Sequence, residues 1–299
     1  TEPGREVAPG PMAVGWGGRC DRLGRWFRMS PTSKLAVVAA RLRLPTLICG
    51  VLLVVTSPLH GQPVVSWAGA VLVAASVLST FVRGLAGRRE PVVVEVPVRG
   101  RWIAINSPAD KVPSHGVHST GQTYAIDLVH WPDPGTVWTP VHRWPLMRRP
   151  EDFPGFGQPV LAPADGRVVR TSNSWRDHWS RNSWPALLYA FVEGSARELL
   201  GPGALLGNHV ILDLGDGTYA ALAHLRRGSI TVSEGQVVRA GQQLAECGNS
   251  GNTSEPHVHF QLMDRRRPAV AAGLPFVFRD REVPKNEEAM IAGAPVESG

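Results

Sequence analysis

The stretch NHVILDLGDGTYAALAHL, residues 208–225, decides the fold class of this chain. Its two apolar runs are separated by Asp216-Gly217, a dipeptide typical of a two-residue turn between antiparallel strands. Runs of the same style stand before and after it, at 92–106, 124–129, 157–171, 229–249 and 257–263. Together they predict a mainly β domain, built on an antiparallel sheet and covering residues 91–280.

One stretch interrupts this β pattern. Residues 172–206 contain Trp175, Trp179 and Trp184, and the sequence PALLYAFVEGSARELLG that follows has helical spacing. We interpret the segment as a helical insertion, which would serve either as a packing lid or as one wall of a substrate groove. Residues 281–299 are predicted to form a polar tail.

Composition fits a folded, basic protein. The 299 residues include only 19% charged side chains, carry a formal net charge of +6 and have a pI of about 9.8. The positive charge fits basic flanks around membrane segments, or affinity for an anionic partner such as wall polymer or lipid headgroups. No nucleic-acid motif is recognisable, so nucleic acid is not an expected partner. Residues 1–34, rich in Gly, Pro and Arg, are predicted to be a flexible tail.

Two apolar segments lie in the region 35–90. Val64–Val82 carries no charge, and a helix of its length rises about 28 Å, close to the thickness of a bilayer core. Leu44–Ser57 is shorter and therefore a doubtful span. The region is predicted to hold one or two transmembrane helices; the alternative is a pair of buried helices. If both segments span, their basic flanks keep both ends cytoplasmic, whereas a single span places the C-terminal domain outside.

Cysteine usage limits the kind of metal site. Cys20, Cys49 and Cys247 are odd in number and widely spaced, so they indicate neither a disulfide framework nor a cysteine zinc site. Any metal would have to be held by histidine and carboxylate side chains.

His257-Val258-His259 is the strongest local signal for chemistry. On a strand, residues i and i+2 share a face, so one imidazole can bind a metal while the other stays free for proton transfer. The alternative is a pair of histidines on a solvent face. The Gly/Asn/Ser-rich run 248–256 just before it is typical of a tight loop that delivers a strand to a cleft.

Two further polar residues stand within apolar strand sequences and are candidates for the site. Asp127 lies within YAIDLV, where a carboxylate is costly unless it is paired or ligates a metal. A salt bridge or a turn-capping role is the alternative. His224 stands at the end of the strand that follows the Asp216-Gly217 turn.

In order along the chain, SHG…YAIDL, QPVLAPADGRVV, GNHVILDLGDGTYAALAHL and EGQVVRAGQQLAECGNSGNTSEPHVHFQL resemble the core of the M23 metallopeptidases, the lysostaphin/LytM-type peptidoglycan endopeptidases. The resemblance covers about 115–263. It implies a β-sheet groove with one zinc ion held by His, Asp and His. The aspartate ligand corresponds to Asp127, the last ligand to His259, and the two non-ligand, catalytic histidines to His224 and His257.

The first histidine ligand stays open between two residues. The family's frequent HxxxD spacing is absent, because Thr123 stands four residues before Asp127. A longer gap leaves His115 and His118 as candidates, and the Ser-His-Gly context favours His115. The remaining histidines of the domain are expected at the surface or in packing roles: His130, His142, His178 and His209.

The resemblance implies a zinc metalloendopeptidase that cleaves peptide bonds in peptidoglycan cross-links or stem peptides by means of zinc-activated water. His224 and His257 would orient or deprotonate that water and stabilise the oxyanion. Because a wall-cutting enzyme must reach the wall, we expect a membrane-anchored protein with an extracytoplasmic peptidase domain.

Two other functions compete with this one. The first is a catalytically silent M23-like domain that binds cell wall or activates another hydrolase. The second is a membrane scaffold or a sugar-binding β domain, in which the His-Val-His pair, Asp127 and His224 would lie far apart. A serine hydrolase is not expected, since the chain lacks a GxSxG nucleophile elbow.

Overall fold

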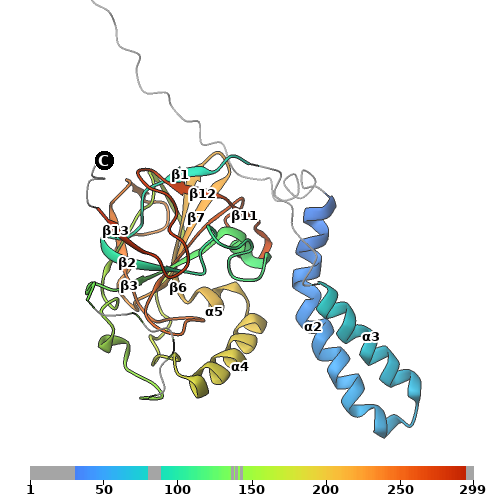
Figure 1. Cartoon of the computed structure of the whole chain (residues 1–299). Helices are drawn as coiled ribbons and strands as arrows, with labels where there is room; N and C mark the ends of the chain where they lie inside the picture. The colour runs from blue at the N-terminus through green and yellow to red at the C-terminus, as the bar shows by residue number, and fades with distance from the viewer. Residues whose placement is uncertain (1–30, 80–88, 136–137, 139–140, 142–143, 294–299) are drawn as a thin grey trace, which may run out of the picture.

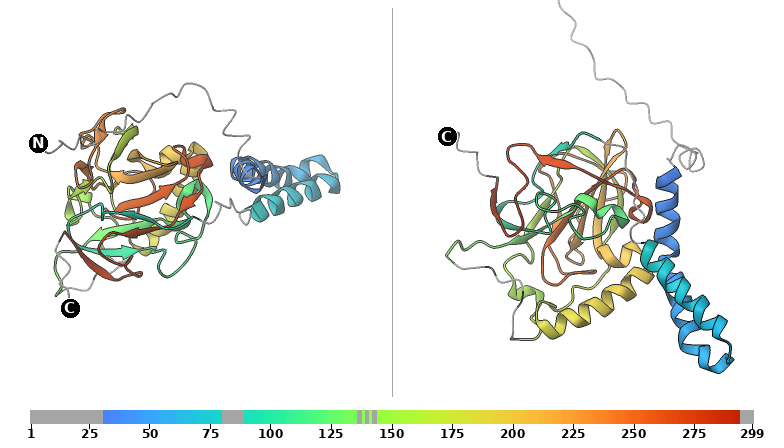
Figure 2. Two further views of the ribbon diagram at one scale, coloured as in Figure 1. Left: turned by 90° about the horizontal axis from the view of Figure 1, so that it is seen from above. Right: turned by 45° about the vertical axis from the view of Figure 1, so that its right-hand side comes forward.

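The computed structural model describes residues 31–79, 89–135, 138, 141 and 144–293. Nearly all of the predicted tail 1–34 lies outside this set, as do His142 and residues 80–82 of the predicted second span. The described part consists of an N-terminal helical hairpin and a β domain, and the hairpin projects from the side of the β domain (Figures 1 and 2).

The hairpin is formed by α2 (Pro31–His60) and α3 (Pro63–Ser79). The two backbones touch where glycines face each other, since a Cβ added to Gly50 would lie 2.9 Å from the Gly69 carbonyl oxygen. The Ser76 hydroxyl donates a hydrogen bond to the carbonyl of Arg43 at 2.7 Å, across the same interface. Small residues at the contact are typical of helix pairs in membranes, where close backbone approach replaces hydrophobic packing.

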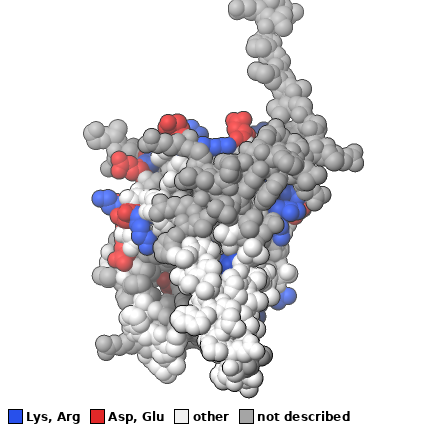
Figure 3. All heavy atoms as spheres, turned by 90° about the vertical axis from the view of Figure 1, so that its right-hand side faces the viewer, with Lys and Arg blue, Asp and Glu red and all other residues white. Residues whose placement is uncertain are grey.

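The two helices differ in the length that the structure describes. Leu42–Leu59 of α2 has a mean hydropathy of 1.8 and is long enough to cross a membrane, whereas α3 is a shorter apolar helix. α2 extends beyond the predicted segment 44–57, through Arg41 and past Ser57, whereas α3 covers the described part of the predicted segment 64–82. Only 6% of the Leu42–Leu59 window is buried, so α2 is not a core helix. Uncharged residues cover most of the hairpin face seen in Figure 3.

The β domain is organised by one nine-stranded sheet with the order β13-β2-β3-β10-β7-β6-β5-β8, in which β11 also pairs with β10. Its strands are antiparallel throughout. They span Gly100–Ile105 (β2), Ile126–His130 (β3), Gly166–Ser172 (β5), Asn208–Gly215 (β6), Thr218–Leu225 (β7), Val237–Val238 (β8), Val258–Met263 (β10), Gly273–Leu274 (β11) and Ala289–Ala292 (β13). The predicted antiparallel fold is therefore confirmed.

Two small sheets flank the large one. β1 (Val92–Val94) pairs in parallel with β12 (Phe276–Phe278), and β4 (Pro159–Leu161) pairs with β9 (Gln243–Glu246). Short 3-10 turns lie at Ser119–Tyr124 (η1), Pro150–Asp152 (η2) and Pro268–Val270 (η3). The core between these layers is apolar, and its largest fully buried members include Trp102, Phe260, Leu222 and Leu244.

The hairpin at the centre of the sequence pattern folds as predicted. β6 and β7 pair antiparallel, and the turn residues Asp216 and Gly217 have φ angles of 48° and 72°. Positive φ at both central positions defines the type I′ turn, which Asp-Gly adopts with little strain.

The helical insertion is modest. Within 172–206 the helices are α4 (Trp184–Leu200), with the Ser183 hydroxyl at its N-terminus, and α5 (Pro202–Leu206). Gly201, with φ 94°, separates the two helices because it adopts a conformation that disfavours other residues.

The prediction of a polar tail over 281–299 is wrong for part of that segment. β13 pairs with β2 at the edge of the large sheet, and Met290 and Ala292 face the core. The apolar signal of this strand is only four residues long, which is too short to stand out from its polar surroundings.

Candidate metal centre and active site

The register of the strands brings candidate site residues together. On β10, His259 lies directly opposite Asp127 of β3 on one side and Ala223 of β7 on the other. Directly opposed residues of antiparallel strands point to the same face and have their Cβ atoms about 5 Å apart. The pairing therefore places Asp127 and His259 side by side, although they are 132 positions apart in the chain.

His224 reaches the same face only because the backbone of β7 is distorted. In a regular strand it would point away from the face that Ala223 and His259 share. Its φ angle of 61° breaks this alternation, and its ring lies 4.8 Å from that of His257 and 5.6 Å from that of His259. A left-handed conformation is strained for a residue other than glycine and is often found at functional sites.

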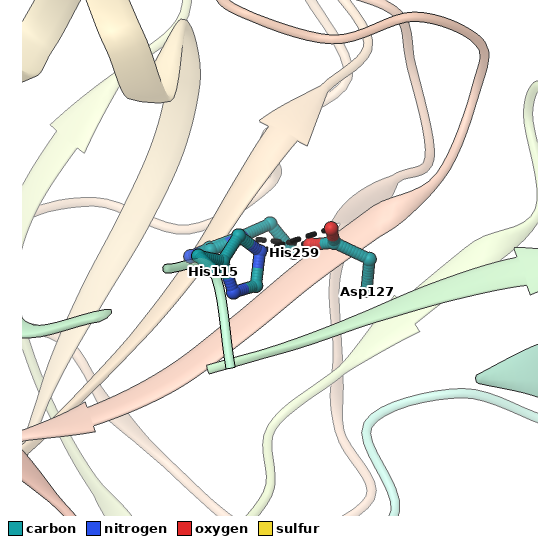
Figure 4. Close-up of side chains that lie close together, drawn as sticks. All are labelled: His115, Asp127 and His259. Carbon is teal, nitrogen blue, oxygen red and sulfur yellow. Dashed lines mark hydrogen bonds and ion pairs between the residues drawn. The ribbon is translucent and has the colours of Figure 1, made fainter. Parts of the chain in front are cut away.

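His115, Asp127 and His259 form the tightest group, shown in Figure 4. His115 Nε2 lies 3.0 Å from Asp127 Oδ2, and His259 Nδ1 lies 2.8 Å from Asp127 Oδ1. One potential ligand atom from each residue lies within 4.8 Å of the others. The side chains of His115 and Asp127 are 14% and 10% exposed, so the group borders solvent.

The alternative first ligand, His118, has a different environment. Its Nδ1 lies 3.2 Å from the Thr123 hydroxyl, and it is not part of the group around Asp127. His115 enters that group from the loop before η1, which a hydrogen bond from Ser114 N to the Thr123 carbonyl closes at 3.1 Å.

Backbone carbonyls orient the two other histidines of the site. His257 Nδ1 lies 2.7 Å from the Glu255 carbonyl oxygen, and His224 Nδ1 lies 2.8 Å from the Ser250 carbonyl oxygen. A carbonyl only accepts, so each Nδ1 carries the proton and each Nε2 keeps its lone pair. His257 Nε2 points into the site, 3.6 Å from Asp127 Oδ1.

Burial and the Asp127 carboxylate determine the protonation states of the site residues. Burial raises the pKa of Asp127, but the facing histidines, His115 first, outweigh it and hold this pKa well below its ordinary value. Burial lowers the pKa values of His224 and His257, so both rings are neutral at pH 7. Burial also acts to lower the pKa of His259, but hydrogen bonding to Asp127 prevails and raises it.

The donor set fits a catalytic zinc ion. Two imidazoles and one carboxylate are a common three-ligand set for such an ion, with a fourth position left for water or substrate. The three side chains converge from different elements, β3, β10 and the loop before η1. In the part of the chain that the structure describes, none of them forms an ion pair with a Lys or Arg side chain. A cation would also offset the charge of the buried Asp127.

Of the histidines expected in surface or packing roles, His142 lies outside the described residues, and the other three are not part of the group around Asp127. His130 packs against Trp102 with ring centroids 4.8 Å apart and ring planes tilted by 57°, and its Nδ1 donates to the Pro154 carbonyl at 3.0 Å. His209 is buried on β6, with its Nδ1 2.7 Å from the Gly207 carbonyl.

Sequence reasoning missed the polar residues that support the loop before β10. Arg181, which is 1% exposed, donates to the carbonyls of Gly251 and Thr253 at 3.1 Å each and pairs with Glu193 of α4. The insertion is thereby fastened to the loop that carries Ser250. Nothing in the local sequence around Arg181 distinguishes it from a surface arginine.

Glu255 is buried in the same region, and its environment leads to a pH-dependent prediction. Burial raises the pKa of its carboxyl from 4.5 to about 7, against the opposing effects of Arg148, Trp138 and Asn182. Below pH 4.5 the carboxyl is protonated in both states. As the pH rises towards 7 only the unfolded state releases the proton readily, so stability falls. Glu255→Gln should remove this decline and stabilise the protein at pH 8 by at most about 3 kcal/mol.

Urea unfolding of both proteins at pH 4.5 and pH 8 measures this effect. The exposed Glu151→Gln serves as the matched control and should leave the pH dependence unchanged. A Glu255→Gln protein that loses stability with pH as steeply as the parent would contradict the assignment.

Comparison with known proteins places this site in a family context. Residues 186–270 match one family profile, and the matched segment contains His224, His257 and His259. The match is to peptidase family M23. It begins after His115 and Asp127, so the first half of the site rests on the geometry described above. The resemblance of the sequence to M23 peptidases is thus confirmed.

The curated proteins to which this chain is similar have two kinds of name. The peptidoglycan DD-endopeptidase ShyA of Vibrio cholerae is 36% identical over 87 residues, covering 28% of this chain and 19% of that protein. The murein hydrolase activator NlpD of Salmonella dublin is 27% identical over 171 residues, covering 57% of this chain and 35% of that protein. The chain therefore spans a minor part of the length of these relatives.

Among solved structures, the catalytic domain of lysostaphin from Staphylococcus simulans is similar with a TM-score of 0.30 and 21% identity, over 53% of this chain and 76% of that one. A zinc-containing peptidase from Vibrio cholerae is similar with a TM-score of 0.29 and 21% identity, over 64% of this chain and 41% of that one.

Proposed function

We propose that this chain is a zinc-dependent endopeptidase that hydrolyses peptide bonds in peptidoglycan, with His115, Asp127 and His259 as the metal ligands. The observation that supports this most strongly is the convergence of five residues in one small volume: these three together with His224 and His257. A scaffold or sugar-binding domain would give no reason for these side chains to meet.

The roles of the two non-ligand histidines follow from their tautomers. Each has Nδ1–H bound to a backbone carbonyl, so Nε2 is the atom available for chemistry. When zinc is bound, it supplies Lewis acidity that lowers the pKa of water and polarises the scissile carbonyl. His257 Nε2, near Asp127, is placed to accept a proton. His224 is neutral at rest, with its lone pair on Nε2, so it could donate to the developing oxyanion only after its Nε2 has taken up a proton during the reaction.

His224→Ala tests the assignment of His224 as a catalytic residue that does not bind the metal. We expect peptide hydrolysis to fall by about 100- to 1,000-fold, the range for loss of one oxyanion or acid–base group. Zinc content should stay at the wild-type level, because His224 is not among the three ligands. Both are measured on the same purified protein, by metal analysis and by release of fragments from peptidoglycan. An equal loss of zinc and activity would contradict the assignment.

Activation of another hydrolase is the alternative function, favoured by the similarity to a murein hydrolase activator over 57% of this chain. A silent domain does not require zinc ligands and catalytic histidines, and here all five residues are present and grouped. Digestion of peptidoglycan by the purified protein alone supports the endopeptidase; digestion only after a second hydrolase is added supports the activator.

The proposed location is the outer side of a membrane, where peptidoglycan is accessible. The apolar Leu42–Leu59 segment has the length and composition of a membrane anchor or a signal sequence. A reporter fused at the C-terminal end of the chain should be active only on the extracytoplasmic side. A cytoplasmic signal would argue that α2 and α3 cross as a pair and would exclude direct contact with the wall.

A further inference from the structure

We propose that Gln261 is a positioning residue that fixes the tautomer of His259 and joins the two halves of the metal centre. The inference rests on the proposed function, since it assigns a role to the surroundings of a proposed ligand. Gln261 lies two residues after His259 on β10, so both side chains point to the same face. It is fully buried, in a strand whose other members besides His259 are apolar. A buried amide in such a strand is costly unless both of its ends are paired.

Both ends of the Gln261 amide do have partners. Its Nε2 donates to the Thr120 carbonyl oxygen at 2.9 Å, and its Oε1 lies 2.8 Å from His259 Nε2. The orientation of the amide follows from chemistry, because a carbonyl oxygen can only accept and would repel Oε1. Oε1 must therefore face the imidazole, which in turn must carry its proton on Nε2.

With Nε2 committed as the donor to Gln261, Nδ1 is the nitrogen that faces Asp127, and a cation can bind it once the proton that Nδ1 shares with the carboxylate is displaced. His259 Nδ1 lies 2.8 Å from Asp127 Oδ1, within the group that can hold a metal. Without an acceptor at Nε2, the neutral ring would keep its proton on Nδ1, bound to the Asp127 carboxylate. That tautomer cannot ligate a cation through Nδ1. The amide of Gln261 thus selects the form of His259 that can bind metal.

The second contact of Gln261 is with η1, the turn that directly follows the loop carrying His115. Thr120 and Gly121 have φ angles of 57° and 79°, which turn the Thr120 carbonyl toward β10. A Cβ added at Gly121 would lie 2.9 Å from Gln261 Nε2 and 2.7 Å from Met263, so this turn is packed directly on the strand. Gln261 therefore links the strand of one ligand to the turn that follows the loop of another.

The other two ligands have comparable outer partners, which supports the interpretation. Asn106 Nδ2 donates to Asp127 Oδ2 at 2.8 Å, and the Ser114 hydroxyl lies 3.1 Å from His115 Nδ1. Outer-shell hydrogen bonds of this kind orient metal ligands, and their removal typically lowers metal affinity 10- to 100-fold. Of the three outer partners, Gln261 is the one that also contacts η1, next to the loop carrying another ligand.

Gln261→Met tests the proposal, because methionine has a similar length and volume but makes neither hydrogen bond. We expect zinc affinity, measured by chelator competition on the full chain, to fall about 10- to 100-fold. Long-range ¹H–¹⁵N spectra of histidine-labelled, metal-free protein should show the Nε2–H form of His259 in the wild type and lose it in the variant. The signal is assigned by its absence from a His259→Asn protein.

Two further variants keep the test decisive. Gln243→Met, at an exposed position of β9, is the matched control and should change neither affinity nor spectrum. Gln261→Glu retains an acceptor for His259 but cannot donate to Thr120, so it should keep the Nε2–H form even if the methionine variant fails to fold. Loss of that form in Gln261→Glu, or wild-type zinc affinity and an unchanged spectrum in Gln261→Met, would overturn the proposal.

Failure of the inference can be separated from failure of the proposed function. Metal affinity and ring tautomer are measured without any substrate. A wild-type protein that binds zinc in the expected manner but leaves peptidoglycan intact would refute the endopeptidase while leaving the role of Gln261 standing.

Discussion

His259→Ala is expected to abolish peptide hydrolysis and to strip the purified protein of zinc. The substitution removes one of the three proposed ligands from the group around Asp127. If the 10–16 kcal/mol of a four-ligand zinc site is shared among its ligands, each contributes about 3 kcal/mol, a factor of about 100 in affinity. Hydrolysis should fall by more than that factor, because His224 and His257 would then lack the metal that supplies Lewis acidity at the site.

Zinc content after dialysis and peptidoglycan digestion measure the two effects. His209→Ala is the matched control, since His209 is also buried in the large sheet but lies outside the site. It should keep both zinc and activity at the temperature where it remains folded. A His259→Ala protein with the wild-type amount of tightly bound zinc would refute the ligand assignment.

Arg181→Met should destabilise the protein by about 3 kcal/mol, the low end of the range for breaking a buried ion pair from one side. The low end applies because Glu193 is also paired with Arg197 at 2.7 Å and retains a partner. The carbonyls of Gly251 and Thr253 would lose their guanidinium donor inside the protein. Because the affected loop includes Ser250, whose carbonyl orients His224, activity should decrease as well.

Chemical unfolding and limited proteolysis of the insertion measure this change, with the exposed Arg176→Met as the control of like chemistry. Cleavage within 173–206 should become faster in the Arg181 variant and stay unchanged in the control. If the two variants were equally stable, the contacts of Arg181 with Glu193 of α4 and with the carbonyls of Gly251 and Thr253 would contribute little to the free energy of unfolding.

The β6–β7 hairpin and several candidate site residues can be predicted from the sequence because short-range patterns encode them. The Asp-Gly turn between two apolar runs predicts the β6–β7 hairpin, and its φ angles agree with the turn expected from that dipeptide. The His-Val-His pair and Asp127 stand out because polar groups in apolar strands need partners. Strand periodicity is local, so these predictions do not depend on knowing which strands are neighbours.

Other features depend on contacts between distant segments, and no local pattern carries them. The place of His115 beside Asp127 depends on how an irregular loop closes, and irregular loops have no period. His224 faces the site through a positive φ angle that histidine does not signal in sequence. Arg181 and Gln261 acquire their roles from carbonyls of remote segments, at Gly251 and Thr120.

The sequence thus establishes the β architecture, the residue types of a histidine–carboxylate metal site and most of the candidate positions. The folded chain selects His115 over His118 as the neighbour of Asp127, adds β13 to the sheet, and sets which nitrogen of each imidazole faces the site. The reason is physical: a residue's type and spacing are properties of its own segment. Hydrogen-bond partners and strand neighbours exist only after segments far apart in the chain have packed together.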